Sequence, residues 1–167
     1  MRNVSRILPL LPGIAMLSGC NNAAQKSNGQ NDQKPNIIYI FADDLGIGDL
    51  SCYGATKVST PNIDRLAGQG VQFTNAYATS ATSTPSRFGL LTGMYPWRQK
   101  NTGIAPGNSE LIIDTACVTM ADMLKDAGYA TGAVGKWHLG LGPKGGTDFN
   151  KQITPNAQSI GFDYEFI

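Results

Sequence analysis

One short segment near the start of the chain constrains the fold more than any other. Residues 36–41 read NIIYIF, an almost unbroken run of β-branched and aromatic side chains. Such a run is typical of a strand that is covered on both faces, as in a parallel sheet. Asp43, Asp44 and Gly46 follow within a few residues. The segment therefore predicts a buried strand that ends in an acidic loop.

A short helix is expected some fifteen residues further on. Thr60 can cap this helix, and Pro61 suits its first position. Gly68 and Gly70 are expected to end it. The apolar side chains expected to face inward are Ile63, Leu66 and Ala67.

A second strand and a second helix are predicted next. Val71, Phe73 and Tyr77 indicate the strand. Residues 85–91 indicate the helix, and Gly93 is placed to stop it.

The last helix and strand complete an alternating pattern. Apolar residues recur every third position at Val118, Ala121, Leu124 and Ala127. Gly128 suits the position just after that helix, and residues 129–134 predict a third strand. The alternation predicts an α/β fold, a mainly parallel sheet with flanking helices and right-handed crossovers. In such sheets the chemistry collects beyond the carboxyl ends of the strands.

The composition fits one globular domain and excludes several other classes of protein. Hydrophobic residues make up 41% of the 167 residues and charged residues 15%. This composition is too apolar for a disordered protein and too mixed for a polytopic membrane protein. Lys and Arg number 13 against 12 Asp and Glu, so no nucleic-acid partner is expected from bulk charge. A single histidine excludes a His-rich zinc site, and three cysteines cannot build a disulfide scaffold.

Residues 1–19 are expected to be a lipoprotein signal peptide rather than part of the fold. Arg2 and Arg6 flank the start of an apolar stretch over residues 7–17 that is too short to span a bilayer. The stretch runs into LSGC, which resembles the bacterial lipoprotein box with Cys20 as the lipid attachment site. An ordinary signal peptide followed by a chance cysteine is the alternative.

Residues 20–34 predict a flexible tether between the lipid and the domain, because they contain no aliphatic side chain larger than alanine. A lipid on Cys20 implies attachment to the membrane of a bacterial cell envelope, on the periplasmic side or at the cell surface. Cys52 and Cys117 can pair in an oxidising compartment or remain two free thiols, and the sequence leaves both possibilities open.

The first of three polar clusters is the carboxylate pair Asp43 and Asp44. Adjacent carboxylates repel each other unless a cation or hydrogen-bond donors separate them. Hard oxygen ligands of this kind suit Ca²⁺ or Mg²⁺. A solvated acidic turn or a helix cap is the alternative interpretation.

The second cluster, residues 83–87, reads STPSR and is followed by LLTG at residues 90–93. Pro85 suits a first helical turn and so places Ser83 at the N-terminal end of the predicted helix. Free N–H groups and the helix dipole favour an anion there. Arg87 lies four residues on and can reach back as a fixed cation. A polar loop that merely caps the helix explains the same residues.

The third cluster follows the last predicted strand. Lys136 and His138 stand two residues apart and would share one side of an extended segment. Two such side chains suit an anionic substrate. A surface lysine beside a hydrogen-bonded core histidine is the alternative.

Together the clusters resemble the sulfatase family of the alkaline-phosphatase-like superfamily. The similar segments extend from Pro35 to residues 161–163 and include STPSRFGLLTG and GYATGAVGKWHLG. The residue that this family converts to formylglycine corresponds to Ser83. The chain therefore resembles the serine-type branch, whose members are matured by a radical enzyme before export. The resemblance implies an alkaline-phosphatase-like fold and hydrolysis of a sulfuric ester.

The resemblance also assigns roles to the residues of the three clusters. The implied metal ligands, for Ca²⁺ rather than Mg²⁺, are Asp43, Asp44 and Ser83. The implied catalytic residues are Ser83, Arg87, Lys136 and His138. Ser83, as formylglycine hydrate, would supply the nucleophile and Arg87 would hold it. Lys136 would bind a sulfate oxygen and His138 would hydrogen-bond the second hydroxyl. The implied partners are a sulfated carbohydrate or aryl sulfate substrate and a serine-type maturase.

The chain departs from the sulfatase pattern in its length. Known sulfatases are considerably longer, and their remaining metal ligands lie downstream of the equivalent of residue 167. Residues 35–167 are therefore expected to be the N-terminal part of a sulfatase catalytic domain, with an incomplete sheet and no activity alone. A phosphodiesterase or phosphonate hydrolase of the same superfamily, and a non-catalytic lipoprotein fragment, are the alternatives.

Overall fold

The computed structural model describes residues 34–167. The predicted signal peptide, the lipid site at Cys20 and nearly all of the predicted tether lie outside the described residues. The chain divides into two units, Met1–Ile40 and Phe41–Ile167. Within the described range, no helix has both the length and the apolar character needed to cross a bilayer.

The described part of the first unit, residues 34–40, contains neither helix nor strand. The strand predicted over residues 36–41 is therefore wrong for this structure. A strand exists through hydrogen bonds to a neighbouring strand, and the strand pair found among the described residues does not include this segment. Ile38 and Ile40 are 84% and 81% exposed.

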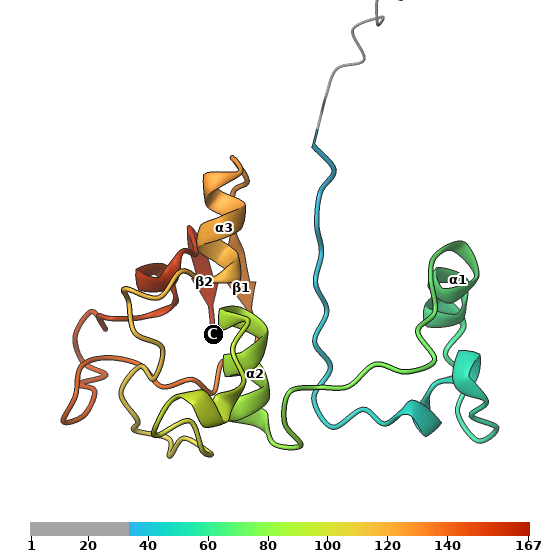
Figure 1. The fold of residues 1–167 in the computed structure, drawn as a ribbon, viewed down its shortest axis with the longest axis horizontal. Coiled ribbons are helices and arrows are strands. Elements are labelled where there is room, and N and C mark those ends of the chain that lie inside the picture. Colours follow the sequence, from blue (N-terminus) through green and yellow to red (C-terminus); the bar gives the residue numbers. More distant parts are fainter. Residues whose placement is uncertain (1–33) are drawn as a thin grey trace, which may run out of the picture. The chain divides into compact units, whose positions relative to one another are not determined.

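Helix α1, Pro61–Gln69, begins and ends where the sequence predicts (Figure 1). Pro61 occupies its first turn, and Gly70 follows its last residue. Side chains tie the start of the helix to the 3₁₀ turn Ser51–Tyr53, because the Ser51 hydroxyl donates to the Asp64 carboxylate over 2.7 Å. The predicted inward face is not covered, since Leu66 is 60% exposed.

Helix α2, Ser83–Thr92, carries the second polar cluster and supplies much of the core. It starts two residues before the predicted range and stops at Gly93, whose φ of 65° is the left-handed conformation that favours glycine. Phe88 and Leu91 of this helix pack in a buried cluster. The other buried members of the cluster are Ile113, Leu139 and Ile160.

Helix α3, Met120–Asp126, begins with a reciprocal cap. The Asp122 backbone N–H donates to the Thr119 hydroxyl, and the Thr119 N–H donates to the Asp122 carboxylate. Gly128, with φ of 84°, follows the helix as predicted. Val118 was expected on the helical stripe, but it precedes the helix and is 71% exposed.

The sheet of the described residues has two parallel strands, β1 (Gly132–Val134) and β2 (Tyr164–Phe166), with Ala133 opposite Glu165. The parallel pairing confirms the predicted α/β character. Strand β1 is shorter than the predicted residues 129–134, and β2 was not predicted. The strand predicted around Val71 and Tyr77 is wrong, because that segment is irregular and Tyr77 is 89% exposed.

A backbone ladder outside the sheet holds the segment that follows β1. The Ile112 N–H donates to the Leu139 carbonyl over 3.0 Å, and the Leu141 N–H donates to the Ser109 carbonyl over 2.9 Å. These bonds fix residues 136–140 beside the loop that follows α2.

Candidate active site

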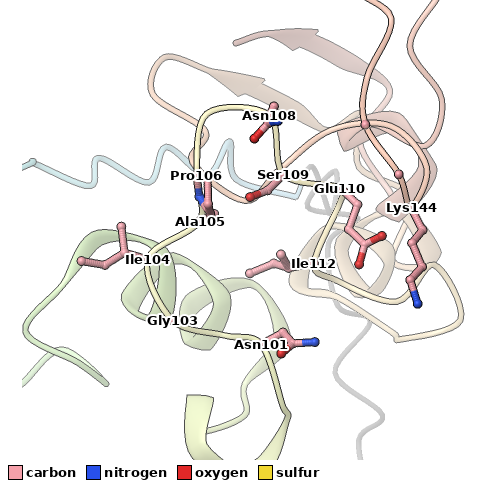
Figure 2. A pocket seen from close by; sticks show the side chains of 12 residues that line it. Asn101, Gly103, Ile104, Ala105, Pro106, Asn108, Ser109, Glu110, Ile112 and Lys144 are labelled. Carbon is pink, nitrogen blue, oxygen red and sulfur yellow. The ribbon is translucent and has the colours of Figure 1, made fainter.

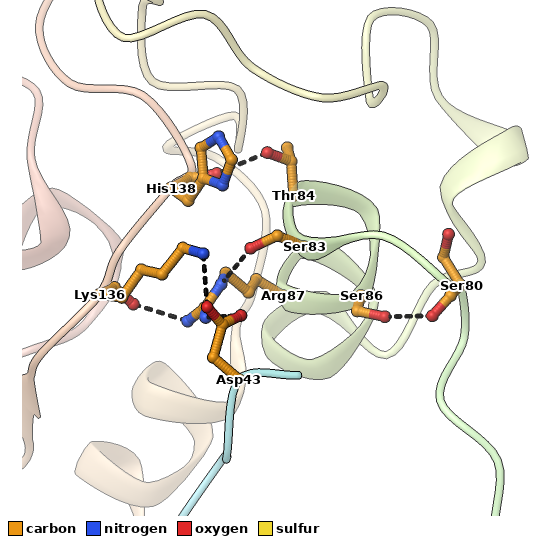
Figure 3. A network of polar contacts seen from close by, with 8 residues as sticks. All are labelled: Asp43, Ser80, Ser83, Thr84, Ser86, Arg87, Lys136 and His138. Carbon is orange, nitrogen blue, oxygen red and sulfur yellow. Dashed lines mark hydrogen bonds and ion pairs between the residues drawn. The ribbon is translucent and has the colours of Figure 1, made fainter. Parts of the chain in front are cut away.

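The N-terminal end of α2 positions Ser83. The preceding residue, Thr82, has extended backbone angles, and Ser83 is the first residue of the helix. The Ser83 hydroxyl oxygen accepts a hydrogen bond from Arg87 Nε over 2.9 Å. The two side chains meet because residues four apart lie on one face of a helix. The expected reach of Arg87 back to Ser83 is thus present in the structure (Figure 3).

Arg87 also connects the helix to two other segments. Its Nη1 donates to the Lys136 carbonyl over 2.6 Å, and its Nη2 lies 3.3 Å from Asp43 Oδ1. Its guanidinium lies over the Phe41 ring, 5.4 Å from the ring centroid. The side chain is only 11% exposed, so it is a buried cation that hydrogen bonds hold in place on several sides.

Asp43 and Lys136 form the exposed side of the same cluster. Lys136 Nζ lies 2.6 Å from Asp43 Oδ2. The Lys136 hydrogen bond is the largest cause that lowers the pKa of Asp43 below its ordinary value, with the charge of Arg87 a smaller one. Asp43 is therefore ionised at neutral pH, and its charge offsets part of the two positive charges beside Ser83.

Asp44 does not join this network. Its backbone has a φ of 54° and its side chain is exposed. Among residues 34–167 no partner for its carboxylate is found. The described residues also contain no group of three or more His, Cys, Asp or Glu side chains placed to hold a metal ion. Calcium prefers about 6–8 oxygens, so the described residues do not complete a calcium site.

His138 lies across the N-terminal end of α2. Its backbone φ of 55° shows that the segment is not extended at this residue. As a result, Lys136 and His138 have different partners, contrary to the expectation of one shared side. Lys136 points to Asp43, whereas His138 Nε2 lies 3.0 Å from the Ala105 carbonyl oxygen. Figure 3 shows the Lys136 ammonium beside Asp43 and the His138 side chain beside Thr84.

Ser86, the other serine of the STPSR segment, has a structural contact. Its hydroxyl donates to the Ser80 carbonyl over 2.6 Å, which holds the loop that leads into α2. Ser83 is therefore the serine of this segment whose hydroxyl meets the arginine.

Two cavities lie beside these residues. One of about 320 Å³ is lined by Lys136 and His138 together with Trp137 and Phe149. The other, of about 540 Å³, is formed by the loop around Ala105 (Figure 2). Its polar lining side chains include Asn101, Asn108, Glu110 and Lys144. Charged and polar groups, Lys136 and His138 among them, thus line space that is large enough for a small molecule.

Sequence reasoning missed the contribution of Thr84 and Ala105 to this region. Thr84 is fully buried, and its hydroxyl bonds both the His138 carbonyl and the Ala105 N–H. Thr84 stands inside the recognised segment, but no local pattern indicates which distant backbone it meets. Ala105 takes part through its main-chain N–H and carbonyl groups, so its residue type gives no signal of this role.

The two cysteines within the described range, Cys52 and Cys117, are both free. Of the two possibilities that the sequence left open, the structure therefore supports two separate thiols.

A serine hydroxyl at a helix N-terminus, beside a buried arginine and a lysine, is a site built for a group that carries negative charge. A model of the Sulfatase family matches residues 35–166. The chain belongs to the sulfatase family. The alkaline-phosphatase-like α/β fold implied by the sequence is thereby confirmed, in the partial form that the described residues show.

Individual relatives agree with this placement. The chain is 90% identical over its 167 residues to an N-acetylgalactosamine-6-O-sulfatase of Bacteroides thetaiotaomicron. It is 50% identical over 115 residues, 66% of the chain, to human arylsulfatase A, of which it covers 22%. A solved structure concerned with the metabolism of multiple glycosaminoglycans by Bacteroides thetaiotaomicron matches 80% of the chain and 28% of its own length, with 96% identity and a TM-score of 0.79.

The chain spans 33%, about a third, of the length of the N-acetylgalactosamine-6-O-sulfatase that it resembles.

Proposed function

We propose that the protein to which this chain belongs hydrolyses sulfuric esters and that Ser83 supplies the reacting group. The single observation that carries the proposal is the contact of 2.9 Å between the Ser83 hydroxyl and the buried Arg87 guanidinium. Family membership of residues 35–166 supports it.

Lys136, Arg87 and Asp43 have different roles in binding the ester group. Lys136 presents an ammonium that is about half exposed and can contact a sulfate oxygen. Arg87 holds the oxygen on residue 83 and offsets negative charge that develops on it. Asp43 keeps both cations in place through its two oxygens.

We further propose that Ser83 is converted to formylglycine by a serine-type maturase. In its hydrated form this residue carries two hydroxyls, one to attack sulfur and one whose deprotonation expels sulfate. An unmodified serine has no such internal route for release.

We propose that Asp43, Asp44 and the modified residue 83 belong to a Ca²⁺ site, with further ligands supplied from outside the described residues. Carboxylate oxygens are the donors that this ion prefers. In this structure the two carboxylate oxygens of Asp43 contact Arg87 and Lys136.

A sulfated carbohydrate is the proposed substrate. The relative that is 90% identical is named for N-acetylgalactosamine-6-O-sulfate chemistry. The cavity beside Lys136 and His138 is also lined by Trp137 and Phe149, and aromatic side chains suit the apolar face of a sugar ring.

We also propose that a lipid on Cys20 anchors the protein in a bacterial cell envelope, facing the periplasm or the cell surface. The change Cys20→Ser should move the protein from the membrane fraction to the soluble fraction. Unchanged retention in the membrane would contradict the proposed anchor.

The test of the proposed function is sulfate release by the whole protein, coexpressed with a serine-type maturase. N-acetylgalactosamine 6-sulfate should be hydrolysed, and Ser83→Ala should abolish release. Ser80→Ala is the matched control, because the Ser80 contact to Ser86 uses the backbone carbonyl. Faster turnover of a matched phosphate diester would favour the alternative phosphodiesterase, and turnover that survives Ser83→Ala would contradict the proposal.

A further inference from the structure

We infer that Thr84 is a positioning residue that fixes the orientation and the tautomer of His138, leaving His138 Nδ1 as the proton-accepting atom. The inference rests on the proposed function of Ser83, and it concerns a residue to which neither family membership nor the relatives' names assign a role. Thr84 directly follows Ser83 in α2.

The Thr84 hydroxyl holds two backbone segments at once. It is fully buried, donates to the His138 carbonyl over 2.8 Å and accepts from the Ala105 N–H over 3.1 Å. A hydroxyl has a single proton to donate, so these two bonds use it in one defined orientation. Removing the hydroxyl leaves the part-buried His138 carbonyl and the buried Ala105 N–H without this partner.

Ala105 closes the ring of contacts. Its carbonyl oxygen lies 3.0 Å from His138 Nε2, while its N–H bonds Thr84. The threonine therefore sets the positions of both the histidine main chain and the carbonyl that meets the histidine ring. Figure 3 shows the imidazole of His138 beside Thr84.

The contact with Ala105 determines which ring nitrogen carries the proton. A backbone carbonyl can only accept, so Nε2 must be the N–H donor. In the neutral imidazole Nδ1 is then an acceptor with a free lone pair. Nδ1 is buried and has no hydrogen-bond partner among residues 34–167. Buried polar atoms without a partner are rare, and one at a reaction site is best explained by a group that arrives during the reaction.

The histidine backbone gives a second reason for the threonine contact. His138 has a φ of 55°, a left-handed conformation that is unfavourable for a non-glycine residue. The bond from Thr84 to the His138 carbonyl helps to hold this conformation, which turns the ring toward Ala105 rather than toward Lys136.

The proton balance of the step is simple. His138 Nδ1 takes the proton of the second hydroxyl on residue 83. The electron pair of that O–H bond forms the carbonyl double bond, and the bond between the same carbon and the sulfate oxygen breaks. Sulfate leaves with the electron pair of that broken carbon–oxygen bond. The Nε2–H bond to Ala105 persists in the imidazolium and stabilises its charge.

The test compares Thr84→Val, Thr84→Ala and Thr84→Ser in the whole protein. Valine keeps the shape and loses both hydrogen bonds, alanine leaves room for water if valine does not fold, and serine restores the hydroxyl. We expect Thr84→Val and Thr84→Ala to lower kcat about 10- to 100-fold with little change in KM, the range that applies to residues that orient metal-ligating histidines. Thr84→Ser should recover most of kcat.

Thr102→Val is the matched control. Thr102 is also a buried threonine, 7% exposed, and its hydroxyl donates to the Pro96 carbonyl over 2.7 Å without contacting His138. It should lower the Tm but leave kcat unchanged. Wild-type kcat in both Thr84→Val and Thr84→Ala, or an equal kcat loss in Thr102→Val, would overturn the inference.

A second measurement does not depend on turnover. In protein labelled with ¹⁵N-histidine, with the signals of His138 assigned through His138→Gln, the Nε2–H tautomer should dominate at neutral pH and should mix with the other tautomer in Thr84→Val. An Nδ1–H tautomer in the wild type would overturn the inference. The expected tautomer without any sulfate release would instead count against the proposed function.

Discussion

At the residue scale, Arg87 is the side chain on which most of the site depends. It joins Ser83, the Lys136 carbonyl and Asp43, which come from three separate segments. A planar guanidinium can direct donors to three such acceptors, whereas a lysine ammonium on a flexible stem cannot match that geometry.

Arg87→Lys is therefore expected to abolish most sulfate release and to lower stability. The part-buried hydrogen bond to the Lys136 carbonyl would be lost, at a cost of about 1 kcal/mol. Urea denaturation and a sulfate assay check both effects. Arg98→Lys, at an exposed arginine in the 3₁₀ turn Pro96–Arg98, is the control and should be near neutral. Equal effects of the two changes would contradict this role for Arg87.

Local chemistry allowed the contact of Ser83 with Arg87 to be predicted, because spacing along a helix fixes which side chains meet. The hydrogen-bond partner of His138 could not be predicted from the sequence. Its ring meets a main-chain oxygen of Ala105, and the left-handed backbone at His138 depends on contacts between segments far apart in the chain.

At the element scale, Asp163, the residue before β2, joins α3 to Thr131, the residue before β1. Its carboxylate lies 2.6 Å from Lys125 Nζ and accepts from the Thr131 N–H over 3.0 Å. The Lys125 hydrogen bond is the largest cause that lowers the pKa of Asp163 below its ordinary value, followed by the Thr131 backbone bond.

The sign of the pH effect follows from that lowered pKa. Asp163 binds its proton more weakly in the folded state than in the unfolded state, so its stabilisation is full above about pH 4 and is lost as the pH falls through the folded-state pKa. Asp163→Asn should lower the free energy of unfolding at pH 7, and the difference from wild type should shrink toward pH 3.

Urea denaturation across this pH range measures the effect. Asp126→Asn, at the exposed last residue of α3, is the control and should change stability little at any pH. A deficit of Asp163→Asn that stays constant with pH would show that the carboxylate charge is not the cause.

The elements themselves were predictable to different degrees. The three helices were predictable, because Pro61, the STPSR segment and Gly128 are local signals near their ends. The apolar runs at residues 36–41 and 71–77 predict strands but form none in this structure, because strand pairing depends on a partner elsewhere in the chain.

At the scale of the whole molecule, large apolar side chains remain uncovered. Ile38, Tyr77, Val134 and Phe166 are all more than 70% exposed, at 84%, 89%, 74% and 72%. Exposed apolar surface and open strand edges promote self-association.

Residues 34–167 produced alone are therefore expected to self-associate, to bind a hydrophobic dye and to release no sulfate. Light scattering and dye fluorescence check the first two outcomes. The double change Ile38→Lys and Ile40→Lys should reduce the association, since both side chains are exposed. A soluble monomer with turnover that depends on Ser83 would contradict the expectation.

The most direct measurement of the central claim is the chemical state of residue 83 in the mature, whole protein. Trypsin should release residues 66–87 as one peptide, which contains Ser80, Ser83 and Ser86. After coexpression with a serine-type maturase, fragmentation by mass spectrometry should place the loss of two hydrogen atoms, as an aldehyde, on residue 83. An aldehyde on Ser80 or Ser86, or three unmodified serines in the presence of an active maturase, would contradict the assignment of Ser83 as the reacting residue.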